Sequence, residues 1–233
     1  MHMCSPNFFA KSLLLSLVMV VPAAFAFSLS DISDKEAASG LKAALEKGSA
    51  AAVSRLGVEN GFLNNAKVKI ELPNILEQAK PLLKMTGRGK QLDELVVSMN
   101  RAAESAVPLA KPLLINAVKS MSVTDAKNIL TGGDTSVTDF FKEKTTGPLA
   151  VKFLPIVKAI TDRSGLATKY NAAVAQVSRF NLVPEQQSTV ETYVTQRALD
   201  GLFYMIGEEE KAIRRDPIGT GSKIIGKVFG SLN

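Results

Sequence analysis

The sequence has very little of the residue types on which most catalytic and metal sites depend. Its 233 residues include one cysteine, one histidine and no tryptophan, and both His2 and Cys4 lie at the extreme N-terminus. The rest of the chain therefore cannot form a Ser–His–Asp triad, a Cys–His nucleophile, a zinc site or a disulfide. Any catalysis would fall to Asp, Glu, Lys, Tyr, Ser or Thr. The sequence predicts no metal site and no cofactor, and we expect a non-enzymatic protein.

A segment without charged residues (12–25) follows Lys11 and ends at an Ala-x-Ala site, Ala24–Ala26. A basic start, a short apolar core and a small-residue exit site are typical of a secretory signal peptide. The apolar core is short for a membrane span. We expect cleavage after Ala26 and a periplasmic mature protein, with an uncleaved N-terminal anchor as the alternative. Residues 1–26 are then the signal peptide.

The remaining residues, 27–233, are enough for one domain with a substantial hydrophobic core. The formal net charge of the whole chain is +6, and its basic residues are mixed with acidic ones along the sequence. This mixture favours an ordinary solvated surface. Nucleic acid is not expected as a partner, because the chain has no nucleic-acid-binding motif and few aromatic residues.

The longest segment with a helical period and no proline runs from Ser188 to Asp216. Its apolar residues recur at steps of three and four and form one stripe, which predicts a long amphipathic helix against which the others pack. The stripe comprises Val190, Val194, Ala198, Leu202, Met205, Ile206 and Ile213. The acidic run 208–210 is expected on the solvated face, where Glu210 is placed to pair with Arg214 four residues later.

The N-terminal third begins with a helix and continues into an extended segment. Ser33 and Glu36 fit a capping box, so we expect a helix from there to about Leu56, ended by Gly57. Apolar and charged residues alternate from Val68 to Leu72, which is the one convincing strand pattern. A lone strand has no ladder partner, and we therefore expect an extended arm lying on helices.

The middle of the chain predicts several helices interrupted by proline. A helical region over 91–121 should break near Pro108 and Pro112. Two Ser-x-x-Asp motifs, 122–125 and 136–139, predict the caps of two short helices. Further helices are expected from about residue 146, with a bend at Pro155 and an end at Gly165, then over 166–179, and weakly in the tail 218–233. Together these predictions describe an all-α fold: a single, proline-kinked bundle of roughly eight helices with one short extended arm.

Two groups of polar residues are candidate binding residues. Tyr193, Arg197, Asp200 and Tyr204 follow one another at steps of four, three and four, so they form one row on the long helix. If buried, the row forms a polar network or a pocket wall; if exposed, it is ordinary surface.

The second group lies in the segment Ser98–Glu104 (SMNRAAE). Asn100 and Glu104 share a helix face, with Arg101 beside them. The group could meet the row on the long helix and form a site, or it could make an interhelical polar contact only.

Four stretches are similar to a bacterial family of exported proteins catalogued as a domain of unknown function. They are Gly61–Asn65 (GFLNN), Ser98–Glu104 (SMNRAAE), Ile129–Asp134 (ILTGGD) and Tyr193–Pro217 (YVTQRALDGLFYMIGEEEKAIRRDP). The resemblance implies an export signal followed by one helical domain. It brings no catalytic residues with it. Gly207 stands where alanine is expected.

Three functions remain open at this point. The leading hypothesis is a non-catalytic binding module for a protein partner or an apolar small molecule. The second is a hydrolase or lyase at the contact of the 188–216 helix with the 98–104 segment, which predicts carboxylates and tyrosines converging in a cleft with shifted pKa values. The third is weak association with an anionic membrane through the basic tail. That tail carries Lys211, Arg214, Arg215, Lys223 and Lys227.

Overall fold

The computed structural model describes residues 33–133, 135–163, 165–178 and 189–230, and the signal peptide predicted for 1–26 lies outside these ranges. The described residues form nine α-helices and one 3-10 turn, which confirms the all-α class. The elements are α1 (Asp34–Leu56), α2 (Asn74–Met85), α3 (Gly89–Ala106), the 3-10 turn η2 (Val107–Leu109), α4 (Ala110–Ser120), α5 (Val123–Thr131), α6 (Ser136–Thr161), α7 (Gly165–Ser178), α8 (Val190–Arg215) and α9 (Lys223–Gly230).

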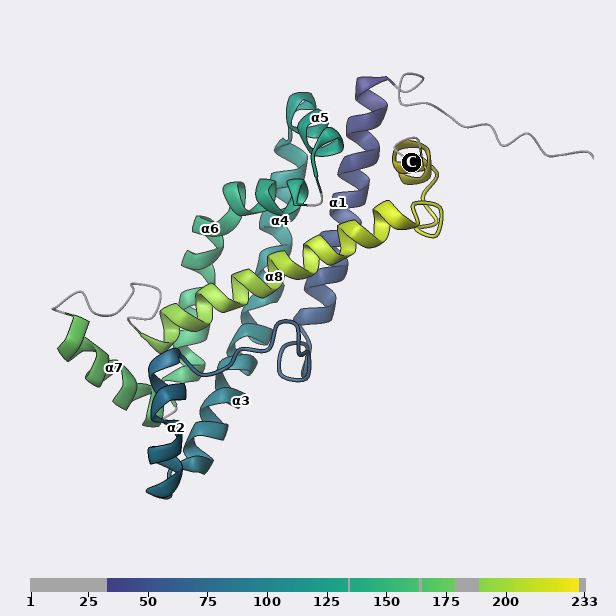
Figure 1. Cartoon of the computed structure of the whole chain (residues 1–233). Coiled ribbons are helices and arrows are strands. Elements are labelled where there is room, and N and C mark those ends of the chain that lie inside the picture. Colours follow the sequence, from purple (N-terminus) through teal and green to yellow (C-terminus); the bar gives the residue numbers. More distant parts are fainter. Residues whose placement is uncertain (1–32, 134, 164, 179–188, 231–233) are drawn as a thin grey trace, which may run out of the picture.

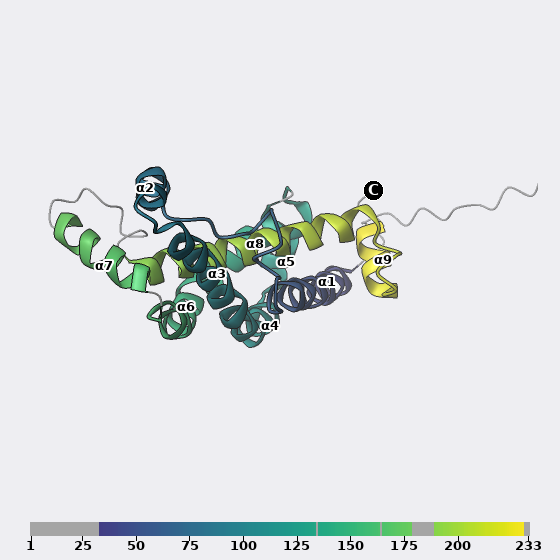
Figure 2. The same cartoon turned by 90° about the horizontal axis from the view of Figure 1, so that it is seen from below.

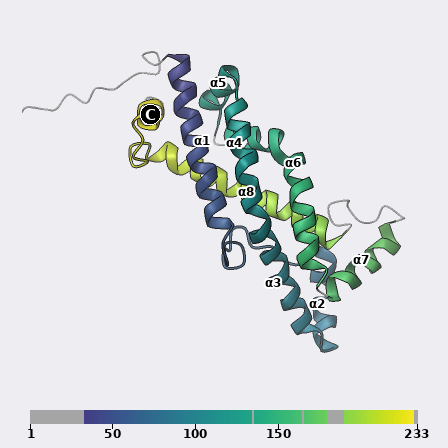
Figure 3. The same cartoon turned by 180° about the vertical axis from the view of Figure 1, so that it is seen from behind.

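Helices α1, α3, α4 and α6 lie side by side in one layer, and α8 crosses this layer diagonally (Figures 1 and 2). Helix α8 packs on α1, α3 and α6, so it does form the common wall of the bundle. Helix α9 packs against α1, and α7 lies at the opposite end of α8 (Figure 3).

Helix α8 matches its sequence prediction closely. All seven residues of the predicted apolar stripe are buried. The helix begins at Val190, after Thr189 accepts a hydrogen bond on its side chain from the N–H of Thr192, and it ends at Arg215 before Asp216. The stripe is continuous because a 3.6-residue period keeps these positions on one side of the helix.

Helix α1 begins with the predicted capping box. The Ser33 hydroxyl accepts from the N–H of Glu36, and the Glu36 carboxylate accepts from the N–H of Ser33. The same carboxylate accepts a hydrogen bond from Lys227 of α9 at 2.9 Å. The Lys227 ammonium first, and the Ser33 hydrogen bonds second, lower the pKa of Glu36 from its ordinary 4.5 to about 2.

The expected break in the 91–121 region is present. The 3-10 turn η2 separates α3 from α4 and contains Pro108. The Ser122 cap of α5 is also confirmed, because Ser122 and Asp125 exchange the two hydrogen bonds of a capping box.

The second cap and the helix after it were predicted wrongly. Helix α6 is one continuous helix of 26 residues, where two helices divided near residue 146 were expected. Its N-cap is Thr135 without a side-chain hydrogen bond, and the Ser136 hydroxyl donates to the carbonyl of Gly133 instead. Pro148 and Pro155 lie inside α6 on its exposed side. Water can solvate the carbonyls that lose their partners there, so the helix continues through both prolines. Gly165 begins α7 rather than ending α6.

Candidate functional site

A connecting arm, residues 57–73, runs from the end of α1 to the start of α2 between α3 and α8 (Figure 1). In its second half Val68, Ile70 and Leu72 are buried, whereas Lys69 and Glu71 are exposed. This alternation is that of an extended chain lying on a surface. The predicted extended arm is confirmed, and within the part of the chain that the structure describes no strand pairs with it.

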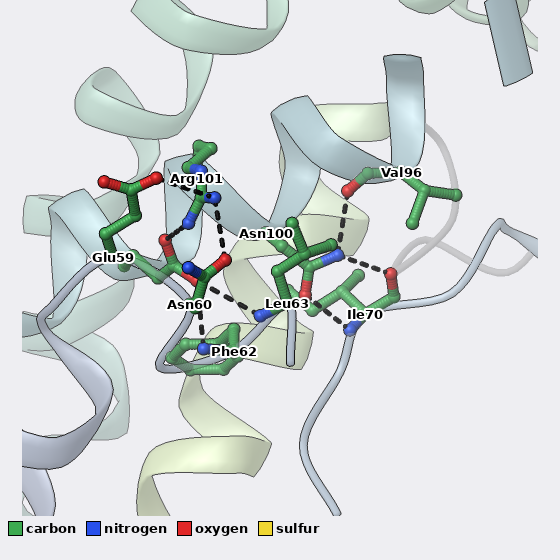
Figure 4. A network of polar contacts seen from close by, with 9 residues as sticks. Glu59, Asn60, Phe62, Leu63, Ile70, Val96, Asn100 and Arg101 are labelled. Atoms are coloured by element: carbon green, nitrogen blue, oxygen red, sulfur yellow. Dashed lines mark hydrogen bonds and ion pairs between the residues drawn. The ribbon is translucent and has the colours of Figure 1, made fainter. Parts of the chain in front are cut away.

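Asn100 of α3 binds both backbone groups of Ile70 (Figure 4). Its Oδ1 accepts from the N–H of Ile70 at 2.9 Å, and its Nδ2 donates to the carbonyl of Ile70 and to the carbonyl of Val96, both at 2.8 Å. The side chain has 0 % of its surface exposed. A buried amide with such partners fixes the arm, because both backbone groups of Ile70 would lose a hydrogen bond without it.

Glu104 fixes the first half of the arm in the same way. Its Oε1 accepts from the N–H groups of Phe62 and Leu63 at 3.0 and 3.1 Å, and its Oε2 pairs with Arg101 Nη1 at 2.5 Å. Arg101 also donates to the side chain of Asn60, which holds a positive φ of 69° in the predicted Asn-Gly turn (Figure 4). Glu104 is buried, and these charge-assisted hydrogen bonds offset the cost of burying it.

Helix α8 meets the other side of the arm. The hydroxyl of Tyr193 donates to the carbonyl of Glu71 at 3.1 Å. Gly201 lets the arm approach closely, because a Cβ atom there would lie 2.8 Å from the ring of Phe62 and 3.2 Å from the Cβ of Val68. The arm is therefore clamped between polar side chains of α3 and a glycine and a tyrosine of α8.

An open groove of about 480 Å³ lies between the arm and α8. Within it, the Arg197 guanidinium lies 5.2 Å from the ring centroid of Tyr193 and 3.7 Å from the Asp200 carboxylate. The lining residues combine the extended half of the arm, the first turn of α2 and the middle of α8. They are Lys67, Val68, Lys69, Ile70, Glu71, Leu72, Asn74, Glu77, Tyr193, Arg197, Asp200, Gly201 and Tyr204.

An ion pair beside the groove joins the arm to α8. Lys67 Nζ lies 2.8 Å from the Glu208 carboxylate and 5.8 Å from the ring centroid of Tyr204. The hydrogen bond with Glu208 raises the pKa of Lys67, and the same bond lowers the pKa of Glu208. Both side chains therefore stay charged over the neutral pH range.

A family model described as "Protein of unknown function (DUF4197)" matches residues 31–230. The chain belongs to the DUF4197 family. This membership agrees with the resemblance to a domain of unknown function, and it assigns no activity. No curated protein and no solved structure matched the chain.

The seven predicted site residues of this DUF4197 protein divide into two groups. Tyr193, Arg197, Asp200 and Tyr204 do lie together, along the α8 wall of the groove. The residues from SMNRAAE do not join them: Asn100, Arg101 and Glu104 contact the α3 side of the arm instead.

The sequence patterns did not predict that the arm forms the other wall of the groove. Lys67, Lys69 and Glu71 line it beside the α8 row. The alternating pattern of 68–72 was the available signal, since it assigns Lys69 and Glu71 to the exposed face.

The prediction that the acidic run 208–210 lies on the solvated face was wrong for Glu210. Glu210 is buried, and its carboxylate accepts from Arg214 at 2.8 Å, as its spacing predicted. A second buried carboxylate, Glu191, accepts hydrogen bonds from Thr161 and Asn171, and it joins α8 to α6 and α7. These contacts link helices in the interior and do not open onto the groove.

The described ranges contain no cluster of three or more Cys, His, Asp or Glu side chains with metal-binding geometry. None of the helices in these ranges combines the length and the apolarity that a membrane crossing requires.

Proposed function

We propose that this DUF4197 protein is a non-catalytic binding module that holds an extended segment of a partner protein in the groove between the arm and α8. The observation that carries the proposal is the orientation of the peptide groups along the arm. An exported, periplasmic setting is part of the proposal, and it rests on the N-terminal sequence alone.

The backbone of the arm offers a free edge to the groove. Asn100 binds both the N–H and the carbonyl of Ile70, so these two groups point toward α3. The peptide bonds on either side of Ile70 are trans, and the carbonyl and N–H of a trans peptide point in opposite directions. The carbonyl of Lys69 and the N–H of Glu71 therefore point away from α3, and neither has a hydrogen-bond partner among the described residues.

This pair of groups is what a neighbouring β-strand recognises. A residue laid opposite Ile70 can donate its N–H to the Lys69 carbonyl and accept from the Glu71 N–H. Addition of an extended peptide to a free backbone edge is a recurrent mode of protein recognition, in which main-chain hydrogen bonds supply affinity and side chains supply specificity.

The side chains around the edge suit a peptide better than an apolar molecule. Arg197 and Lys69 supply positive charge, Asp200 and Glu71 supply negative charge, and the exposed face of Tyr204 supplies an aromatic surface. Tyrosine and arginine are enriched where protein segments are recognised. Charges of both signs at one site favour a segment with alternating or neutral side chains over a strongly charged polymer.

Two alternatives from the sequence receive less support. The apolar hollow beside Ala44 and Ile206 has a volume of about 10 Å³, which is room for about one water molecule and not for an apolar ligand. A hydrolase or lyase would need Glu104 beside the α8 row, but both of its oxygens are bound to the arm and to Arg101. We therefore propose neither an internal apolar ligand nor a catalytic site.

The proposal is tested by selecting binders from a phage-displayed library of random dodecapeptides against the purified mature protein. Selected peptides should lose affinity about tenfold or more for Arg197→Ala and Tyr204→Ala, since these truncations remove groove contacts. They should keep their affinity for Arg88→Ala, an exposed arginine outside the groove. Selection of no peptide, or of peptides that bind all three variants like the unmodified protein, contradicts the proposal.

A further inference from the structure

Helix α2 leaves most of its apolar side chains in solvent. Of its residues, Leu76 alone is buried, whereas the exposed fractions are 42 % for Ile75, 65 % for Leu82 and 86 % for Met85. Isolated apolar residues on a surface need no explanation, but three on one twelve-residue helix are unusual.

The three exposed residues share one face of α2. Leu82 lies two turns after Ile75, and Met85 follows about one turn later, which places all three residues on one side of the helix. The stripe lies next to the side of α2 that packs on α3, where Leu83 is partly covered. Helix α2 and the start of α3 form one end of the molecule (Figures 1 and 3). The stripe is therefore presented at an accessible tip.

Positive charge accompanies the stripe. Residues 74–90 contain Lys80, Lys84, Arg88 and Lys90 against the single acid Glu77. Glu77 pairs with Lys80, and Lys90 approaches Glu94, whereas Lys84 and Arg88 have no ion pair within the described residues. At the C-terminal end of α2, Lys84 directly precedes Met85 and Arg88 follows it by three residues, so both unneutralised cations flank the exposed end of the stripe. An apolar side chain flanked by cations is complementary to a surface that is apolar inside and anionic outside.

We propose that the α2 tip docks on an anionic membrane surface, with Leu82 and Met85 entering the outer acyl region and Lys84 and Arg88 meeting lipid phosphates. This contact is separate from the groove and does not depend on the peptide proposal. Long basic side chains reach the headgroup layer while the apolar side chains beside them are buried, which is the usual geometry of an interfacial helix.

The basic C-terminal tail is a weaker candidate for the same role. Lys211 pairs with Glu208, and Lys227 pairs with Glu36, so the acids of the protein itself neutralise these charges. Arg214 is likewise paired with Glu210. The membrane contact expected from the sequence is thus reassigned from the tail to α2.

The exposed apolar residues of α6 provide a matched control. Val151 is 76 % exposed and Leu154 is 43 % exposed, comparable with the residues of α2. Lys144 and Lys158 on this helix are paired with Glu143 and Asp162, whereas the exposed Lys152 next to Val151 has no ion pair within the described residues. This face therefore has a similar apolar content with one unpaired cation beside it instead of two, so it should bind an anionic surface more weakly.

The experiment uses the absence of tryptophan from the sequence. Met85→Trp and Val151→Trp each place one fluorophore in the otherwise unchanged protein, and each is mixed with vesicles of phosphatidylcholine alone or with added phosphatidylglycerol. We expect the emission of the residue-85 probe to shift to shorter wavelength with anionic vesicles only, and the emission of the residue-151 probe to shift clearly less. Equal shifts at both positions, or none at position 85, overturn the proposal.

A flotation assay with the same anionic vesicles identifies the groups responsible. The double variant Lys84→Glu/Arg88→Glu and the single variant Leu82→Ser should each reduce binding by about tenfold or more, because each removes a proposed contact with the membrane. All three side chains are exposed, so their replacement should leave the fold intact. Arg215→Glu/Lys223→Glu, which reverses two exposed cations of the tail that have no ion pair within the described residues, should leave binding unchanged. Loss of binding in the tail variant alone overturns the assignment. A change of oligomeric state in Leu82→Ser without a change in flotation also overturns it, since it identifies the stripe as an interface between copies.

Discussion

Replacing Glu104 by alanine tests whether the arm is held by buried polar groups. The carboxylate is buried and binds three donors: the N–H groups of Phe62 and Leu63 and the guanidinium of Arg101. Each buried N–H that loses its acceptor costs about 1–3 kcal/mol. Arg101 keeps its contacts with Glu59 and Asn60 near solvent, so the loss of its bond to Glu104 adds less to the free-energy cost. We expect Glu104→Ala to lower the free energy of unfolding by about 3 kcal/mol.

This change is large enough for an ordinary unfolding measurement. A domain of about 200 residues loses roughly 2–4 °C of Tm per kcal/mol, so the expected decrease in Tm is about 6–12 °C. Urea unfolding followed by far-UV circular dichroism gives the free energy itself. Glu104→Gln keeps one acceptor oxygen for the backbone and loses the charge that faces Arg101, so its expected cost is about 1–2 kcal/mol.

The matched control is Glu94→Ala on the same helix. Glu94 is exposed, and within the described ranges it forms a single ion pair, with the exposed Lys90 at 3.6 Å. Exposed pairs of this kind contribute about 0–1 kcal/mol. If Glu104→Ala is no more destabilising than Glu94→Ala, the arm does not depend on Glu104 and the reasoning is refuted.

Three further substitutions test packing and electrostatics. Gly201→Ala should destabilise the protein by about 1–2 kcal/mol, because the added Cβ meets the buried ring of Phe62 at 2.8 Å. Gly207→Ala should be neutral or up to about 1 kcal/mol stabilising, because its Cβ meets only the rotatable hydroxyl of Thr138 and alanine favours the helix. Glu36→Gln should lower stability at neutral pH but not at pH 2, since the pKa of Glu36 is depressed in the folded state from 4.5 to about 2.

Each of these predictions has a measurement that can contradict it. Thermal unfolding compares the two glycine variants, and an equal loss of stability in both would show that contact with the arm does not decide the outcome. For Glu36→Gln, a depressed pKa stabilises the folded state above pH 4.5, and this contribution is lost as the pH falls toward 2. The gap between variant and parent should therefore close over that range, and a constant gap would contradict the assignment.

Most of the fold followed from local patterns. The burial of α8 along seven predicted positions and the caps at Ser33 and Ser122 are consequences of helical period and short-range hydrogen bonding, which a sequence displays directly. The error at α6 has the opposite origin. A proline inside a helix is tolerated more easily where water can solvate the carbonyl that loses its partner, and the exposure of Pro148 and Pro155 depends on tertiary packing that the sequence does not display.

The candidate site was half predictable for a related reason. A step of three or four residues put Tyr193, Arg197, Asp200 and Tyr204 on one face without knowledge of the fold. The partners of Asn100 and Glu104 in the arm could not be found that way. They lie more than 25 positions earlier in the chain, where the period of α3 gives no information. The backbone groups of an irregular arm carry no side-chain pattern that would identify them as ligands of buried carboxylate and amide groups.

The most direct test of the central claim is the hydrogen exchange of two adjacent backbone amides. In the free protein the Ile70 amide is bound to Asn100 and should exchange slowly, whereas the Glu71 amide has no partner among the described residues and should exchange rapidly. Addition of a selected groove-binding peptide should slow exchange at Glu71 and leave Ile70 unchanged. Rapid exchange at Glu71 in the saturated complex would show that the peptide does not pair with the arm, and would contradict the proposed mode of binding.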